Sequence, residues 1–215
     1  MVPPRNPPQA TVGAVERGNA VVLVTLDPAG ALLDRRRVAL TEGLSTHPYH
    51  HEGAWAVGRY LNAPWARPMQ LDDAIALVRQ VQAAAEHGAD EAVAALAGSV
   101  AVPIGAIAIR AWPSLPPTIE ARIRDARAQT MADSVMYRQA LAGAAEARGW
   151  AVHAYEPDHV LRDTVDAVTA IGKAAGPPWR AEQKLAAAAA LAIRRDHLAR
   201  DRKTGDVGRA ASEEP

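Results

Sequence analysis

One stretch, from Ala20 to Thr41, constrains the fold more than any other part of the 215-residue sequence. Residues 20–26 form an almost wholly apolar run rich in β-branched side chains, which is typical of a buried strand. Asp27 ends this run, and Pro28 and Gly30 follow it as residues that favour a tight turn. Residues 31–41 then resume a strand in which three successive arginines place charge on both faces. The stretch therefore predicts two strands joined by a turn, with the second strand exposed on one side or near a sheet edge.

The rest of the chain alternates between apolar runs and helical periods. The sequence predicts a strand at Ala54–Tyr60, a helix at Gln70–Ser99 with a break near Gly88, a buried strand at Val100–Ala111, a helix at Thr118–Arg148, a strand at Trp150–Tyr155, a helix from an Asp158 cap to about Lys173, and a last helix at about Arg180–Arg200. The resulting order, βββαβαβα, predicts one α/β domain. Its mixed sheet of about five strands has helices on both faces.

The two ends of the chain differ from this pattern. Residues 1–19 carry proline pairs, which fix φ and remove backbone donors, and so predict a flexible arm. Residues 201–215 are polar and predict a disordered tail. The domain itself is then expected to span residues 20–200.

Composition excludes several classes of protein. The net charge is +0 and the pI about 7.1, so any nucleic-acid site must be a local patch. The absence of cysteine excludes disulfides and thiolate metal sites and fits a cytoplasmic protein. No apolar run reaches the length of a membrane span, and the segment MVPPRNPPQ lacks the apolar core of a signal peptide. A soluble, cytoplasmic protein is therefore expected.

Two short passages resemble a known family. The segment LDPAG at Leu26–Gly30 is similar to the end of the first strand in Holliday junction resolvases of the RuvC type, a branch of the ribonuclease H-like superfamily. The segment ARGWAVHAYEPDHV at Ala147–Val160 is similar to a helix–strand passage of the same branch. The expected order of strands and helices also resembles the ribonuclease H-like order. The block from Met131 to Pro157 resembles bacterial proteins of this fold more than the resolvases themselves.

The resemblance implies a two-metal nuclease. Chemistry of this kind uses carboxylates at strand tips and on the last helix to hold two Mg²⁺ or Mn²⁺ ions, which prefer oxygen ligands. Asp27 corresponds to the acid of the first strand and Glu182 to the acid of the last helix. The acid of the fourth strand has no counterpart, because Arg110 stands near that tip, so the catalytic set is incomplete. Asp27 has a second interpretation, as a cap of its own turn. The resemblance also implies a homodimer.

A separate cluster of candidate ligands follows the hairpin: His47, His50, His51 and Glu52. Histidines three and four residues apart, followed by a glutamate, can converge on a transition metal such as Zn²⁺. They can also supply acid–base groups near neutral pH. The alternative is a solvated loop, an interpretation that the neighbouring proline and glycine favour.

Polar residues elsewhere have two interpretations as well. Gln129, Asp133 and Tyr137 fall on one face of a predicted helix, where they either line a site or belong to a solvated face, the interpretation favoured here. Basic residues near the C-terminus either contact phosphates or form a solvated helix end: Arg194, Arg195, Arg200 and Lys203.

Three functions stay open from the sequence. The first is a divalent-metal-dependent, resolvase-like nuclease acting on DNA or RNA through Asp27 and Glu182. The second is a non-catalytic member of the same fold that binds nucleic acid or a protein. The third is an enzyme that uses the cluster at residues 47–52 for other chemistry. The missing acid of the fourth strand favours the second.

Overall fold

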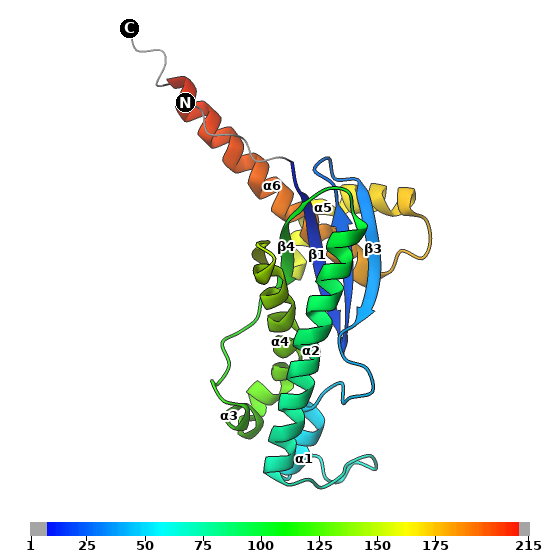
Figure 1. Ribbon diagram of the computed structural model, residues 1–215, viewed down its shortest axis with the longest axis vertical. Helices are drawn as coiled ribbons and strands as arrows, with labels where there is room; N and C mark the ends of the chain where they lie inside the picture. Colours follow the sequence, from blue (N-terminus) through cyan, green and yellow to red (C-terminus); the bar gives the residue numbers. More distant parts are fainter. Residues whose placement is uncertain (1–7, 211–215) are drawn as a thin grey trace.

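The computed structural model describes residues 8–210, with side chains described as far as Arg195. Five strands and their flanking helices follow one another along the chain (Figure 1). Their bounds are β1 (Ala10–Arg17), β2 (Ala20–Leu26), β3 (Leu32–Ala39), the π-helix η1 (Tyr49–Gly53), α1 (Ala54–Ala56), α2 (Leu71–Ser99), β4 (Ile104–Arg110), α3 (Ile119–Arg124), α4 (Ala126–Ala147), β5 (Ala151–Tyr155), α5 (Pro157–Ala175) and α6 (Ala181–Ala210).

The five strands form one mixed sheet in the order β3-β2-β1-β4-β5. β1 and β2 are antiparallel, as are β2 and β3, whereas β4 runs parallel to both β1 and β5. An antiparallel three-strand meander extended by two parallel strands through helical crossovers is the ribonuclease H-like arrangement. The expected α/β class, the mixed sheet of five strands and the fold are therefore confirmed, although one of the five strands is not the predicted one, and the arginine-rich strand β3 does lie at an edge.

The predicted flexible arm is wrong for residues 10–17, which form β1 at the centre of the sheet. Its first six residues are buried, and it pairs with β2 so that Arg17 faces Ala20. Gly18 and Asn19 are thus a two-residue hairpin loop, and Gly18 has the positive φ of 60° that such a turn requires. The prolines end at residue 8, and the β-branched run that follows them is a strand. Residues 1–7 lie outside the described part.

Several other predicted boundaries are corrected by tertiary packing. Residues 54–60 are not a strand: Ala54 and Trp55 are buried in the helical turn α1, which packs on η1, and η1 in turn packs against α4. The predicted helix at 118–148 is two helices, divided at Asp125, whose carboxylate caps α4 by accepting hydrogen bonds from the N–H groups of residues 127 and 128. α2 continues through Gly88, where the Leu40 backbone packs too closely for a side chain. Glu156, and not Asp158, is the N-cap of α5.

The last helix is longer than predicted. α6 continues to Ala210 and extends past the body of the domain (Figure 1). The prediction of a disordered tail from residue 201 is therefore wrong as far as residue 210. Residues 211–215 lie outside the described part.

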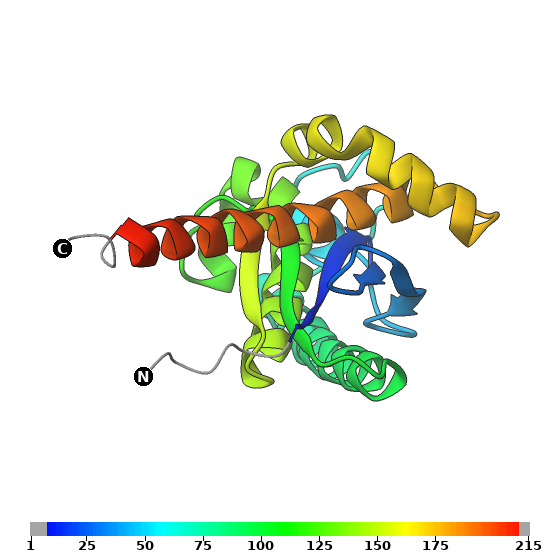
Figure 2. The same ribbon diagram turned by 90° about the horizontal axis from the view of Figure 1, so that it is seen from above.

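Helices cover both faces of the sheet. Figure 2 shows α5 and α6 on one face and α2 on the other, where α4 packs beside it. The core under α2 and α4 contains Leu23, Ile107 and Leu141, and the core under α6 contains Val24, Leu26 and a run of alanines. None of the helices among the described residues has both the length and the apolar character needed to cross a membrane.

The alanine run of α6 explains how closely this helix lies on the sheet. Ala186 to Ala190 are fully buried. A Cβ atom placed on Gly13 of β1 would lie 1.8 Å from the carbonyl oxygen of Ala186. The hydroxyl of Thr11 donates to the carbonyl oxygen of Ala190 at 3.1 Å. Only small side chains allow this approach, which fixes the first turns of α6 against the first half of β1.

Candidate functional site

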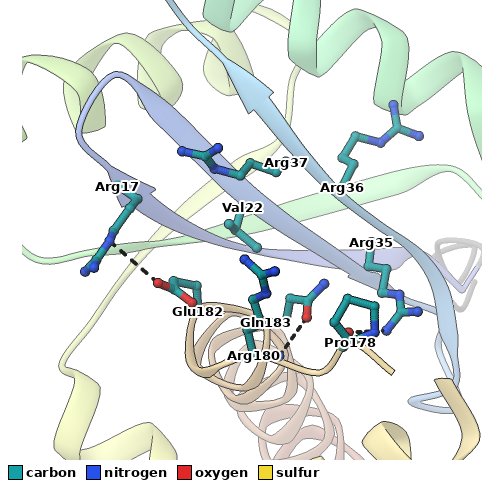
Figure 3. Close-up of a pocket in the computed structure, with 9 residues that line it drawn as sticks. All are labelled: Arg17, Val22, Arg35, Arg36, Arg37, Pro178, Arg180, Glu182 and Gln183. Carbon is teal, nitrogen blue, oxygen red and sulfur yellow. Dashed lines mark hydrogen bonds and ion pairs between the residues drawn. The ribbon is translucent and has the colours of Figure 1, made fainter. Parts of the chain in front are cut away.

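A cavity of about 520 Å³ lies between the face of β2 and β3 and the start of α6. Strand residues alternate in direction, so Arg35 and Arg37 face α6 opposite Val24 and Val22, whereas Arg36 points to the other face. In Figure 3 the Arg35 side chain extends toward Pro178 just before α6, whereas Arg36 points away from this helix. The groups that we call the arginine pocket are Arg17, Arg35, Arg37, Arg180 and Glu182.

Of the four guanidinium groups in the arginine pocket, two are free, one is bonded to backbone carbonyl oxygens and one faces a carboxylate. Arg35 donates to the carbonyl oxygens of residues 175, 176 and 178 at 2.9–3.2 Å, and so fixes the loop that leads into α6. Within the described residues, the guanidinium groups of Arg37 and Arg180 have no hydrogen bond or ion pair. Arg17 faces Glu182 at 3.6 Å and is 73% exposed. The pocket therefore holds cationic groups available to a ligand.

The balance of charge in the arginine pocket is strongly positive. Its four arginines face a single carboxylate, that of Glu182. Arg36 does not contribute, because on the opposite face it pairs with Asp34 at 2.7 Å. The start of α6 adds the partial positive charge of a helix N-terminus. Guanidinium groups bind phosphate and carboxylate through paired hydrogen bonds, so the pocket is suited to an anion.

The two carboxylates predicted to share metal ions lie far apart along α6, Glu182 in its first turn and Asp27 beside its middle. Asp27 ends β2 rather than the first strand, and its Oδ1 accepts a hydrogen bond from the N–H of Ala31 at 2.8 Å. Arg194 donates to the carbonyl oxygen of Pro28 at 2.7 Å, so this turn lies beside residue 194. Glu182 lies twelve residues earlier, about 18 Å away along the helix. Asp27 thus caps its turn, as the second interpretation held.

The carboxylate that does lie on β1 is Glu16, a residue that the sequence analysis missed. Arg138 of α4 donates to it through Nε at 2.7 Å and through Nη2. Both side chains are more than nine-tenths buried, at 8% and 9% exposure. Arg110 occupies the tip of β4. A carboxylate already paired with a buried cation, next to a second cation, does not fit a site for two divalent ions.

The predicted histidine cluster forms a set of adjacent rings. The His51 ring lies 5.3–6.0 Å between centroids from the rings of His47, His50, Trp55 and Trp65, and the His50 ring lies 5.7 Å from that of Tyr60. We call these six residues the ring cluster. Burial and the neighbouring imidazoles lower the pKa values of His47 and His50, which favours neutral rings at pH 7.

Glu52 does not join these imidazoles. Its carboxylate accepts a hydrogen bond from the hydroxyl of Ser45 at 2.9 Å. In the described part of the chain, no group of three or more histidine, aspartate or glutamate side chains is arranged to hold a metal ion. His47, His50, His51 and Glu52 are therefore not grouped around one point in this structure, and a metal site there stays a prediction.

The polar residues of α4 hold this loop and are not solvated. Asp133 accepts hydrogen bonds from the N–H groups of Tyr49 and His50, both at 3.0 Å. Tyr137 donates to the carbonyl oxygen of Thr46 at 3.1 Å, and Gln129 accepts from Arg59 at 3.1 Å. Gln129, Asp133 and Tyr137 are all buried, so the favoured interpretation of a solvated face is wrong. The sequence signal for these buried contacts was the row of polar side chains at consecutive turns of the helix. Their hydrogen-bond partners belong to a segment more than 60 residues away.

We expect Asp133 to make stability depend on pH. Desolvation raises the pKa of its carboxyl from 3.8 to about 7, against the opposing effect of the two N–H donors. Because the folded pKa exceeds the unfolded one, the folded state binds the proton more tightly. The free energy of unfolding then falls as the pH rises from about 4 to about 7, by a few kcal/mol at about 1.4 kcal/mol per pKa unit.

The test compares wild type with Asp133→Asn by urea unfolding between pH 4.5 and 8. Other groups, including His47 and His50, titrate in both proteins and largely cancel in the difference. The stability of wild type relative to the variant should fall up to about pH 7 and then level off. A difference that is constant across this range would contradict the assignment.

The predicted basic C-terminal residues have structural roles where their side chains are described. Arg194 holds the turn at Pro28, and Arg195 donates to the Asp163 carbonyl oxygen at 3.0 Å and faces its carboxylate at 3.5 Å. Arg200 and Lys203 lie beyond the side chains that the structure describes. Two free arginines, Arg37 and Arg180, lie together in the arginine pocket, which the sequence analysis did not identify.

A second cavity, of about 720 Å³, lies at the carboxyl ends of β4 and β5 beside α5. Its charged residues are Glu156, Asp163 and Arg195, together with His159. Arg195 is engaged by Asp163, so this cavity lacks a free guanidinium group. The arginine pocket is therefore the stronger candidate for binding an anion.

Comparison with known proteins found no family model that matches the chain and no curated protein that matches its sequence. Two solved structures are similar to it. One is RuvC of T. thermophilus in complex with a Holliday junction substrate, at 13% identity and a TM-score of 0.48, covering 85% of this chain and 90% of that chain. The other is a structure of Thermus thermophilus RuvC, at 13% identity and a TM-score of 0.45, covering 85% and 92%.

Proposed function

We propose that this chain is a ribonuclease H-like module that binds the phosphate groups of a nucleic acid in the arginine pocket and does not hydrolyse them. The observation that carries the proposal is the pair of free guanidinium groups, Arg37 and Arg180, facing one cavity beside Arg17. Arginine forks bind phosphate oxygens in pairs, and such contacts supply most of the sequence-independent affinity for nucleic acids.

The carboxylates support binding without cleavage. Two-metal hydrolysis needs several carboxylates within a few ångströms of one another to hold both cations. Glu182 is separated by about 18 Å along α6 from Arg194, which holds the turn of Asp27, and Glu16 is engaged by Arg138. The donor set therefore does not fit two Mg²⁺ or Mn²⁺ ions, and we derive no metal-dependent step.

The arginine pocket is tested by replacing Arg37 and Arg180 with serine, singly and together. Each loss removes a charge-assisted contact, so we expect about tenfold weaker binding of a fluorescent 20-nucleotide strand for each arginine. Fluorescence anisotropy at fixed salt measures the affinity. The matched control is Arg79→Ser, because Arg79 is exposed on α2, on the opposite face of the sheet. Equal affinities for wild type and the double variant would overturn the proposal.

The absence of hydrolysis is tested with plasmid and branched DNA in Mn²⁺, using Asp27→Asn and Glu182→Gln as controls. We expect no cleavage above that of the two variants. Cleavage by wild type that either substitution abolishes would show a nuclease and contradict the proposal.

A further inference from the structure

We propose that the exposed edge of the ring cluster is a stacking platform for the bases of a single-stranded nucleic acid. The proposal rests on the proposed function and adds the form of nucleic acid that binds. Its starting point is exposure: Tyr60 is 50% and Trp65 54% exposed, and Leu61 between them is 44% exposed. Large apolar side chains exposed together on one surface indicate a binding site.

The exposed rings belong to one continuous array. Tyr60 lies against the ring of His50, His50 lies 5.5 Å from His51, and His51 lies 5.3 Å from Trp65. The Trp55 ring is parallel to the His51 ring within 10°, and its centroid lies 5.9 Å from that of Trp65. Because Trp55 is buried and the other rings rest on one another, the outer rings have solid support. Tyr60 and Trp65 thus expose about half of their surface to solvent while resting on neighbouring rings.

The loop that carries these rings is held rigidly. Asp133 fixes its start through two backbone N–H groups. The side chain of Arg59 donates to the carbonyl oxygens of Ile123 and Arg124 at 2.8 and 2.5 Å. Tyr60 itself has a positive φ of 56°, a conformation that is strained for an aromatic residue. Side-chain contacts to the backbone that fix a strained, exposed aromatic residue are typical of a preorganised binding surface.

The charge of the loop selects the partner. Residues 53–71 contain two arginines, Arg59 and Arg67, and no aspartate or glutamate. Arg67 is exposed and has no partner among the described residues. Glu52 precedes this segment and its carboxylate accepts a hydrogen bond from Ser45, so the free charge that the segment itself adds beside the rings is the guanidinium of Arg67. Flat apolar rings next to a free guanidinium suit a ligand that combines flat faces with negative charge. Single-stranded nucleic acid has both, because its bases are unpaired and can stack on aromatic rings.

The ring cluster and the arginine pocket meet at the β1–β2 hairpin. Arg17 lines the pocket, and the next residue, Gly18, lies against Thr46 and His47. A Cβ atom on Gly18 would be 3.0 Å from Thr46 and 4.0 Å from Cε1 of His47. One strand can therefore place its phosphates in the arginine pocket and its bases over the rings on the other side of this turn.

The test measures the affinity of the full chain for a labelled 20-nucleotide single strand and for a duplex of the same length. We expect Trp65→Ala and Tyr60→Ala each to weaken single-strand binding about tenfold and to leave duplex binding unchanged. Trp65→Phe and Tyr60→Phe, which keep a stacking ring, should restore most of the affinity. Thermal melting followed by circular dichroism checks that each variant folds.

The outcomes separate this proposal from the one on which it rests. Unchanged single-strand affinity in both alanine variants, together with weaker binding by the arginine-pocket variants, would overturn the stacking platform and leave the phosphate site standing. Equal loss of single-strand and duplex binding in the alanine variants would also overturn it, because duplex bases cannot stack on the rings. No binding of either nucleic acid by wild type would overturn both.

Discussion

Arg138→Met is expected to destabilise the fold by about 3–5 kcal/mol, because it leaves a buried carboxylate without its cation. Arg138 donates to Glu16 through two nitrogens and to the carbonyl oxygen of Ala111 at 3.0 Å through the third. These contacts join the end of β1, the end of β4 and the middle of α4. Methionine has a similar length and no charge, so it removes the interaction with little change in packing.

Urea unfolding at pH 7.5 measures this loss. The matched control is Arg127→Met, because Arg127 is exposed on the same helix and its side chain has no partner among the described residues. That change should lie within about 0.5 kcal/mol of wild type. The double variant Glu16→Gln, Arg138→Met should recover part of the loss, because the remaining buried group is neutral. A loss below about 1 kcal/mol for Arg138→Met alone would contradict the burial of the Arg138–Glu16 ion pair.

Gly13→Val is the second substitution with a large expected effect. A Cβ at this position would lie 1.8 Å from the backbone oxygen and 2.7 Å from the backbone carbon of Ala186. Backbone atoms cannot rotate away, so α6 must lift from the sheet. We expect a loss of about 3 kcal/mol or more, at the upper end of what overpacking costs. The arginine pocket should also be lost, since α6 and the residue before it supply Glu182 and Arg180.

Thermal melting and nucleic-acid binding by the same samples test this expectation. Gly143→Ala is the control, because Gly143 is exposed in α4 and nothing lies within 4 Å of its added Cβ. It should stabilise the helix by about 0.5–1 kcal/mol. Wild-type stability and affinity in Gly13→Val would show that α6 does not lie as closely on β1 as described.

The fold was accessible from the sequence because its buried strands and long helices have strong local patterns. The first strand was the exception. The proline pairs before residue 10 obscured β1, and an apolar helical turn at residues 54–56 was taken as a strand. One strand was missed and one was added, so the predicted order βββαβαβα agrees with the observed order of the main elements although β1 was not predicted. One consequence was that Asp27 was assigned to the end of β1 when it ends β2.

The functional surfaces depended on contacts that no local pattern contains. Three successive arginines correctly predicted charge on both faces of an edge strand. The arginine pocket, however, forms only because Arg35 contacts residues 175–178, which lie 140 to 143 positions later in the chain. The sequence predicts Asp133 on a solvent-exposed helix face. The loop at residues 49–50 that covers Asp133 has no regular hydrophobic pattern, so nothing in the sequence indicates that it packs there. Whether polar residues in the middle of a helix are buried or exposed can be decided only when their hydrogen-bond partners, distant in the sequence, are known.

The central claim is that phosphates bind in the arginine pocket without being hydrolysed. Its most direct test is the affinity of wild type and of Arg37→Ser, Arg180→Ser for a labelled single strand across a salt series in Mn²⁺, with the recovered strand checked for length. Each phosphate contact contributes about 0.7 to the slope of log affinity against log salt for single strands. We predict a slope about 1.4 units shallower for the double variant and an intact strand in every sample. Equal slopes, or a strand cut by wild type, would contradict the claim.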